Sequence, residues 1–160
     1  NNISFHLRDP YLSDAHKASF SEVITGIISE IDAEHIAWIT VVCPLMNSEN
    51  YKESFDAYNK IIRKKQYDSL VGVNLLKEYL WNDNGPINYE ANRNHIISQE
   101  LPNIYKVTNS IYISSKENVL QNKYLIGQKP YLQVLPNYCG IDIDTWFDYK
   151  LACSFLNINE

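Results

Sequence analysis

A nearly continuous apolar run at positions 36–43, Ile-Ala-Trp-Ile-Thr-Val-Val-Cys, constrains the fold of this chain most strongly. A run of this kind, ended by Pro44, is typical of a strand buried on both faces, as in a parallel sheet. Helical patterns lie on either side, within residues 19–31 and 48–62, and residues 68–75 form a second strand-like segment. Strand, helix and strand in this order predict a right-handed crossover in one sheet, and therefore an α/β fold.

The helical patterns predict which residues face the core. Ser19 and Glu22 form a capping box that starts the first helix. The residues expected to face inward on the first two helices are Phe20, Val23, Ile24, Ile27, Ile28, Ile31, Tyr51, Phe55, Tyr58, Ile61 and Ile62. Further along, strands are expected at 107–114 and 130–135, with a short helix at 116–121. A final helix is expected to turn Phe147, Leu151 and Phe155 inward.

Composition bounds the class of protein. The chain has 160 residues, of which 45% are hydrophobic, and this suffices for one domain with a core. A net charge of -5 argues against a general nucleic-acid binder, and the short basic run 63–65 fits a helix end. No apolar stretch has membrane-spanning length. The three cysteines show no paired spacing, so they predict buried thiols in a reducing compartment, the cytoplasm.

The middle of the chain differs from both halves. Residues 81–86, Trp-Asn-Asp-Asn-Gly-Pro, form a strong turn signal, and Asn, Pro and Tyr dominate from there to Tyr105. The whole chain holds 12 tyrosines. Tyrosine suits interfaces and sugar-binding clefts, although ordinary core packing explains most of these residues.

Two carboxylates near the C-terminus are the best candidate for chemistry. In an extended segment Asp142 and Asp144 would point to the same face and aim at one point. Paired carboxylates suit Mg²⁺ that is held together with substrate phosphates. The alternative is structural, because Asp144 is also a good helix N-cap. Thr145 with Asp148 resembles a capping box in which Asp replaces the usual Glu or Gln.

Seven segments in order resemble one family. They are Arg8-Asp9-Pro10-Tyr11-Leu12 with Ser19, Cys43-Pro44-Leu45, Tyr67-Asp68-Ser69-Leu70-Val71, Ser98-Gln99-Glu100-Leu101-Pro102, Asn109-Ser110-Ile111-Tyr112-Ile113, Ile126-Gly127-Gln128-Lys129-Pro130 and Ile141-Asp142-Ile143-Asp144. This order resembles the acylneuraminate cytidylyltransferases, or CMP-sialic acid synthetases, over nearly all of the chain.

The resemblance implies a fold and an activity. Such enzymes have a Rossmann-like nucleotidyltransferase sheet, and they join CTP to an acidic sugar, releasing pyrophosphate. They need Mg²⁺ and usually form homodimers. The resemblance therefore implies one domain over residues 1–160, with residues 77–110 as a dimerisation arm that covers the sugar site. It also implies a cytoplasmic role in cell-surface polysaccharide biosynthesis.

The resemblance also implies roles for single residues. Arg8 and Ser19 would bind the nucleotide, and Asp142 and Asp144 would be the catalytic, metal-binding acids.

On the sugar side, Gln99, Asn109 and Tyr112 are the matching positions. Asn109 and Tyr112 belong to an Asn-Gly-x-Ile-Tyr-Ile pattern whose register leaves open whether Thr108 takes the Asn place instead.

The chain departs from the family in three places, one of which is the usual arginine before Gln99, where this chain has Ile97 and Ser98. The family's N-terminal loop of Gly, Ser, Lys and Arg, which cradles the triphosphate, has no counterpart before Arg8. The chain is therefore expected to correspond to the C-terminal two-thirds of such an enzyme. The family's polar Gln is absent from the segment 40–45, Thr-Val-Val-Cys-Pro-Leu. These departures keep a second hypothesis open, a non-catalytic relative that binds a sugar or nucleotide, or that only dimerises.

Overall fold

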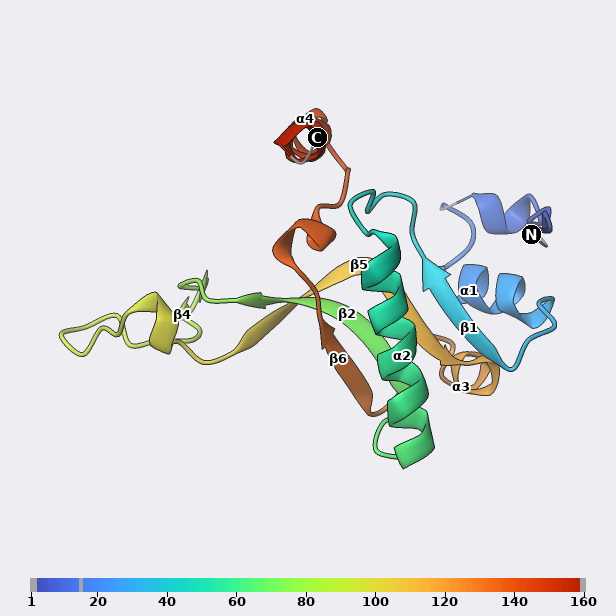
Figure 1. Cartoon of the computed structure of the whole chain (residues 1–160), viewed down its shortest axis with the longest axis horizontal. Helices are drawn as coiled ribbons and strands as arrows, with labels where there is room; N and C mark the ends of the chain where they lie inside the picture. The colour runs from blue at the N-terminus through green and yellow to red at the C-terminus, as the bar shows by residue number, and fades with distance from the viewer. Residues whose placement is uncertain (1–2, 15, 159–160) are drawn as a thin grey trace. The chain divides into compact units, whose positions relative to one another are not determined.

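The computed structural model describes residues 3–14 and 16–158. The chain combines helices and strands, as Figure 1 shows. The helices are α1 (Phe20–Ser29), α2 (Ser48–Lys64), α3 (Lys116–Asn122) and α4 (Trp146–Ile158), with short 3-10 helices at Tyr11–Ser13, Ser98–Glu100 and Asn137–Gly140. The strands are β1 (His35–Ile39), β2 (Ser69–Leu76), β3 (Trp81–Asn82), β4 (Gly85–Pro86), β5 (Ile104–Ser115) and β6 (Pro130–Val134). No helix within the described ranges is long and apolar enough to cross a membrane.

Four strands form one mixed sheet in the order β1-β5-β2-β6. β1 and β5 are antiparallel, with Ala37 opposite Ile113. Two backbone hydrogen bonds, from Asp68 N–H to the Lys129 carbonyl (3.1 Å) and from Leu135 N–H to the Val73 carbonyl (2.8 Å), show that β2 and β6 run parallel. The predicted α/β class is therefore confirmed. The two strands of the predicted crossover share the sheet, but β5 separates them.

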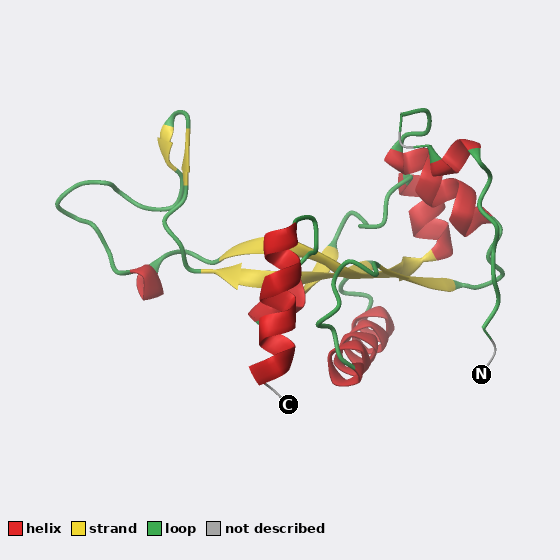
Figure 2. Cartoon of the chain, turned by 90° about the horizontal axis from the view of Figure 1, so that it is seen from above, coloured by secondary structure: helices red, strands yellow, loops and turns green. Residues whose placement is uncertain are grey.

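The described residues fall into two compact units. The first unit takes in those of Asn1–Thr40, Asn47–Val71 and Ile111–Gln133. Within it, α1 packs against α3 on one face of the strands, and α2 lies on the other face (Figure 2). Its core includes the fully buried side chains of Ile24, Ile28, Leu70, Ile111 and Val119.

The second unit takes in the described residues of Val41–Met46, Gly72–Ser110 and Val134–Glu160. Val73, Leu101, Thr108 and Cys139 form part of its core. Cys43 and Cys139 are buried, as predicted, whereas Cys153 is only partly buried. Burial, followed by the neighbouring Cys43, raises the pKa of Cys139 to about 11.

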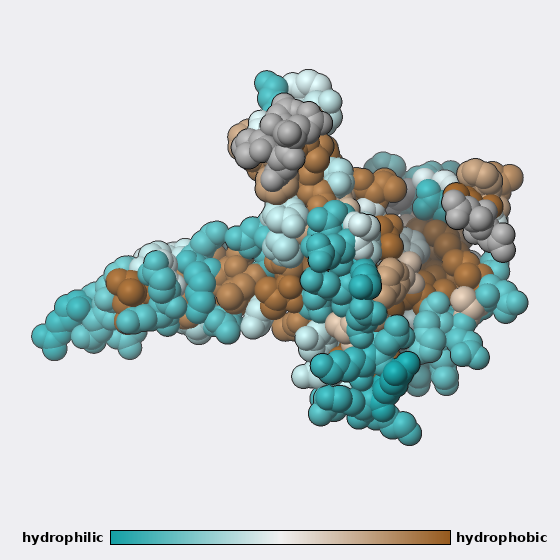
Figure 3. All heavy atoms as spheres, viewed as in Figure 1, coloured by the Kyte–Doolittle hydropathy of each residue, from teal (hydrophilic) through white to brown (hydrophobic). Residues whose placement is uncertain are grey.

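Within the second unit, the chain leaves β2 for a long excursion before it returns as β5. Asn88 holds the start of this excursion, because its side chain accepts a hydrogen bond from Leu80 N–H (3.0 Å) and donates one to the Glu78 carbonyl (2.8 Å). Tyr79 stacks on His95 with ring centroids 4.7 Å apart. Figure 3 shows a largely hydrophilic surface over the excursion. The dimerisation role expected for residues 77–110 stays a prediction.

The predicted first strand is too long and its burial is wrong. β1 ends at Ile39, and Ile36 is its only buried residue. Val41 is 94% exposed. A run of apolar residues does not show which face of a strand is covered, and β1 lies at one end of the strand order with β5 as its only neighbour among the described residues.

The capping box that starts α1 is confirmed. Glu22 N–H donates to Ser19 Oγ (3.3 Å), while Ser19 N–H donates to the Glu22 carboxylate (2.8 Å). The hydrogen bonds from Ser19 hold the pKa of Glu22 below its ordinary value.

The predictions for the buried faces of α1, α2 and α4 are partly wrong. On α1, Phe20 is 57% exposed. On α2 the buried residues are Asn50, Ser54, Tyr58 and Ile61. Phe55 is instead 39% exposed. Small polar residues can occupy the inner face because their hydrogen bonds are satisfied locally: Ser54 Oγ donates to the Asn50 carbonyl at 2.8 Å.

On α4, Phe147 and Leu151 are 72% and 44% exposed, whereas Ala152 is buried. Phe155, predicted to face inward, stacks on Tyr138 with centroids 4.6 Å apart. Aromatic residues at helical spacing therefore misled the prediction for the first turn of this helix.

Candidate active site

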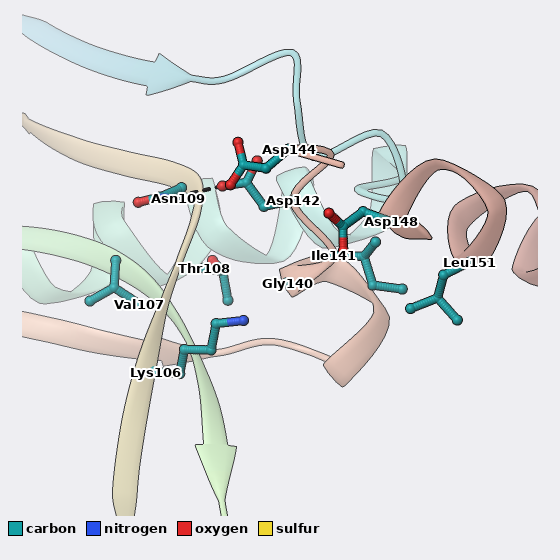
Figure 4. A pocket seen from close by; sticks show the side chains of 10 residues that line it. All are labelled: Lys106, Val107, Thr108, Asn109, Gly140, Ile141, Asp142, Asp144, Asp148 and Leu151. Atoms are coloured by element: carbon teal, nitrogen blue, oxygen red, sulfur yellow. Dashed lines mark hydrogen bonds between the residues drawn. The ribbon is translucent and has the colours of Figure 1, made fainter. Parts of the chain in front are cut away.

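A pocket of about 430 Å³ lies within the second unit. It is lined by Lys106, Val107, Thr108, Asn109, Gly140, Ile141, Asp142, Asp144, Asp148 and Leu151 (Figure 4). The lining comes from three places: the part of β5 that belongs to this unit, the loop after the 3-10 helix Asn137–Gly140, and the start of α4. Three carboxylates and one amine are therefore gathered around a single space.

Asn74, on β2, anchors the chain ahead of the loop that carries the aspartates. Its buried side-chain amide donates to the carbonyls of Leu135 and Pro136, both at 3.0 Å. Gly140 packs directly against it, since a Cβ on Gly140 would lie 1.9 Å from Asn74 Oδ1 and 3.2 Å from the methyl group of Thr108. Only glycine fits this approach, so the backbone ahead of Asp142 is tightly placed.

The aspartates do not lie on a strand, contrary to the prediction. The segment from Ile141 to Asp144 has no regular secondary structure, and Asp144 N–H donates to the Asp142 carbonyl at 3.2 Å, which closes a tight turn. Ile143 N–H donates to the Val42 carbonyl at 2.9 Å and anchors the turn. Both carboxylates nevertheless line the same pocket and lie side by side in Figure 4.

Thr145 and Asp148 cap α4, as the capping-box pattern predicted. The Thr145 N–H and hydroxyl donate to the Asp148 carboxylate at 2.8 and 2.6 Å, and Asp148 N–H donates back to Thr145 Oγ1 at 3.3 Å. Since the helix begins at Trp146, Thr145 occupies the N-cap position and Asp144 does not. The structural alternative for Asp144 is thereby removed.

This cap is expected to make the stability of α4 depend on pH. The hydrogen bonds from the Thr145 side chain and then its backbone hold the pKa of Asp148 below its ordinary value. A carboxyl with a lowered folded-state pKa stabilises the fold above its unfolded pKa of about 4 and loses that contribution as the pH falls through the folded-state pKa. Thr145→Ala should therefore flatten the fall in thermal midpoint between about pH 5 and pH 3.

The matched control is Ser154→Ala, which removes a hydroxyl from the same helix that donates only to the Lys150 carbonyl. Thermal unfolding followed by circular dichroism across this range checks the prediction. Equal pH slopes for wild type and Thr145→Ala would contradict it.

Asp142 has the environment expected of a metal ligand. Its Oδ2 accepts a hydrogen bond from Asn109 Nδ2 at 3.1 Å, drawn as the dashed line in Figure 4. Its Oδ1 is buried and has no hydrogen-bond partner among the described residues. A buried carboxylate oxygen left in this way is costly unless a ligand satisfies it.

The residues present fit Mg²⁺, which binds one or two carboxylates and completes its shell with water and substrate phosphates. Asp142 and Asp144 would hold such an ion. Within residues 3–14 and 16–158, no group of three or more His, Cys, Asp or Glu side chains is placed to hold a metal. An ion held by these two carboxylates would complete its shell with water or with substrate phosphates.

Asn109 has an unusual backbone for a residue within a strand. Its φ of 57° is left-handed, a conformation that favours glycine and that Asn tolerates better than most residues. This supports the alternative register of the Asn-Gly-x-Ile-Tyr-Ile pattern, in which Asn109 takes the Gly place and Thr108 takes the Asn place.

Lys106 is a pocket residue that the sequence reasoning missed. It is the only cation among the described residues that line the pocket, and in Figure 4 its amine reaches in among the lining residues. It also lines an adjoining cavity of about 530 Å³, which shares Gly140 and Ile141 with the first. Its place two residues before Thr108 on β5 was a usable signal, because alternate residues of a strand share a face.

The other predicted site residues do not line this pocket. Arg8 and Ser19 belong to the first unit, where Arg8 Nε donates to Ser13 Oγ (3.2 Å) and Ser19 caps α1. Tyr112, also in the first unit, is buried on β5 opposite Trp38. Gln99 is exposed in the 3-10 helix Ser98–Glu100 and does not line the pocket. Their ligand-binding roles stay predictions.

Comparison with known proteins finds a solved structure with a similar fold. No protein-family model matches the sequence, and no curated protein matches it. Among solved structures, the chain resembles 4-diphosphocytidyl-2C-methyl-D-erythritol synthase from Anaerococcus prevotii DSM 20548, with a TM-score of 0.61 and 12% sequence identity. The match covers 88% of this chain and 65% of that chain. At this identity the likeness concerns the fold alone, and the fold is a mixed α/β fold shared with a diphosphocytidyl-compound synthase.

Proposed function

We propose that the chain acts as a cytidylyltransferase that joins CTP to an acidic sugar of the sialic acid type and releases pyrophosphate. The observation that carries the proposal is the pocket in which Asp142 and Asp144 lie side by side with an unsatisfied buried oxygen. Two findings support CTP as the nucleotide. The fold is similar to that of a diphosphocytidyl-compound synthase, and seven sequence segments occur in the same order as in the cytidylyltransferases.

The reaction is an in-line displacement. The anomeric hydroxyl of the sugar attacks the α-phosphorus of CTP, a new O–P bond forms, and the bond from the α-phosphorus to the bridging oxygen breaks, so that pyrophosphate leaves. The hydroxyl proton passes to solvent or to a pocket carboxylate. Mg²⁺ bound by Asp142 and Asp144 would supply positive charge beside the phosphates.

The chain's own residues would position the acidic sugar. Lys106 offers the positive charge that the sugar's carboxylate needs, at the junction between the two cavities. The adjoining cavity offers room for the rest of the sugar, with the polar side chains of Glu78 and Asn137 in its wall. The hydrogen bonds from Asn74 to the chain ahead of the acidic turn would help to keep the acids in place while the substrates bind.

The test is release of pyrophosphate from CTP in the presence of Mg²⁺ and sialic or legionaminic acid. Lys106→Gln should raise the KM for the acidic sugar about tenfold while kcat changes less, because a charge-assisted contact is lost. Lys60→Gln, which removes a lysine on α2 that does not line this pocket, serves as the matched control. A wild-type chain that is inactive with both acids, or an unchanged KM in Lys106→Gln, would contradict the proposal.

A second candidate function is a binding module without catalysis. The pocket is lined by three carboxylates and a single amine, a balance that repels a triphosphate unless a divalent cation binds with it. Calorimetric binding of CTP or of the acidic sugar, without any release of pyrophosphate, would favour this second function.

A further inference from the structure

The hydrogen bond between Asn109 and Asp142 gives Asn109 a role other than contact with a sugar. The two residues are 33 positions apart in sequence, and the bond joins β5 to the acidic loop within the second unit. An amide N–H that donates to one carboxylate oxygen fixes the orientation of the whole group. The other oxygen, Oδ1, is the one left without a partner among the described residues.

The backbone around Asn109 is held in its unusual conformation from both sides. Thr108 and Ser110 are both buried, and their hydroxyl oxygens lie 2.6 Å apart. The Thr108 hydroxyl also lies 3.1 Å from the Gly72 carbonyl, and Ser110 N–H donates to Thr108 Oγ1 at 3.4 Å. A left-handed residue within a strand persists only where its surroundings enforce it, and such strain concentrates at functional sites. The effect here is to turn the Asn109 amide toward Asp142.

We infer that Asn109 is a positioning residue that orients the Asp142 carboxylate for a divalent cation. The inference rests on the metal-binding part of the proposed function, and it does not depend on which sugar or nucleotide is used. Partners that hold a ligating side chain typically change metal affinity 10- to 100-fold when they are removed, on the order of the effect expected here.

The variant Asn109→Gly tests the side chain of Asn109 separately from its backbone conformation. Glycine accepts a φ of 57° without strain, so the backbone is kept and only the amide is lost. The probe is Mn²⁺ alone, titrated into the whole chain and followed by electron paramagnetic resonance in the absence of CTP and sugar. The expected result is an Mn²⁺ affinity about tenfold weaker, with an unchanged thermal midpoint.

Two controls separate positioning from general destabilisation. Lys65→Gly replaces another left-handed residue, with φ 53°, at the end of α2 and should leave Mn²⁺ affinity unchanged. In an Asp142→Asn background, Asn109→Gly should cause no further loss, because the two residues act as one unit. Independent, additive losses would assign Asn109 a different role.

The outcomes distinguish this inference from the proposed function. Wild-type Mn²⁺ binding that is weakened by Asn109→Gly, in a chain that releases no pyrophosphate, would support the inference and refute the transferase. Failure of the wild type to bind Mn²⁺, or equal affinity in the wild type and Asn109→Gly, would overturn the inference.

Discussion

Asp142→Asn is expected to lower the rate of pyrophosphate release by a factor on the order of 100 to 1000. The substitution keeps the size of the side chain but removes the charge beside the phosphates, and it turns a buried carboxylate oxygen into an amide group. Asp144→Asn should lower the rate in the same direction, and it should leave α4 intact because Thr145 and Asp148 cap that helix. Steady-state assays over a range of Mg²⁺ concentrations measure both effects.

The matched control is Asp56→Asn, which removes one negative charge from the exposed surface of α2. It should leave the rate within about twofold of wild type, as is usual for a surface change. Full activity in Asp142→Asn would refute the assignment of this acid to the reaction. A rate loss in Asp56→Asn of the same size would mean that overall charge, not the pocket, decides activity.

Gly140→Ala is expected to destabilise the protein by about 2–4 kcal/mol. The new Cβ would lie 1.9 Å from Asn74 Oδ1, so the side chain of Asn74 must leave its position. Its two hydrogen bonds to the carbonyls of Leu135 and Pro136 would then break in a buried setting. Urea unfolding followed by tryptophan fluorescence measures the change in the free energy of unfolding.

Gly26→Ala is the matched control for this substitution. Its Cβ would meet only the tip of the Leu12 side chain, at 2.5 Å, which can rotate away. Alanine is also favoured over glycine within a helix by about 1 kcal/mol, so this variant should lose little or gain stability. A loss in Gly140→Ala no larger than in Gly26→Ala would show that the contact with Asn74 is not rigid.

Much of the fold could be predicted from local patterns. The capping box at Ser19 and the helix that starts at Ser48 were visible because their signals lie within one turn. The strand order could not be predicted, since β5 inserts between β1 and β2 through pairings far apart in sequence. The prediction of buried residues failed where apolar residues such as Val41 and Phe147 are exposed, because composition does not specify what covers a residue.

The candidate site was predictable in part. Asp142 and Asp144 were found from their spacing, although the expected strand proved to be a tight turn. Lys106 and the link from Asn109 to Asp142 were missed in the residue-by-residue reasoning, because both depend on β5 and the acidic loop meeting in space. A positive φ at a non-glycine residue is likewise invisible in a sequence.

The buried amide of Asn74 has a consequence for recognition. Because it ties two carbonyls of the chain ahead of the acidic turn, we expect that turn to be ordered before any ligand binds. The conformational entropy of the turn is lost when the chain folds and not a second time when a ligand arrives. The pocket should therefore be preorganised, and its backbone should adapt little from one ligand to the next.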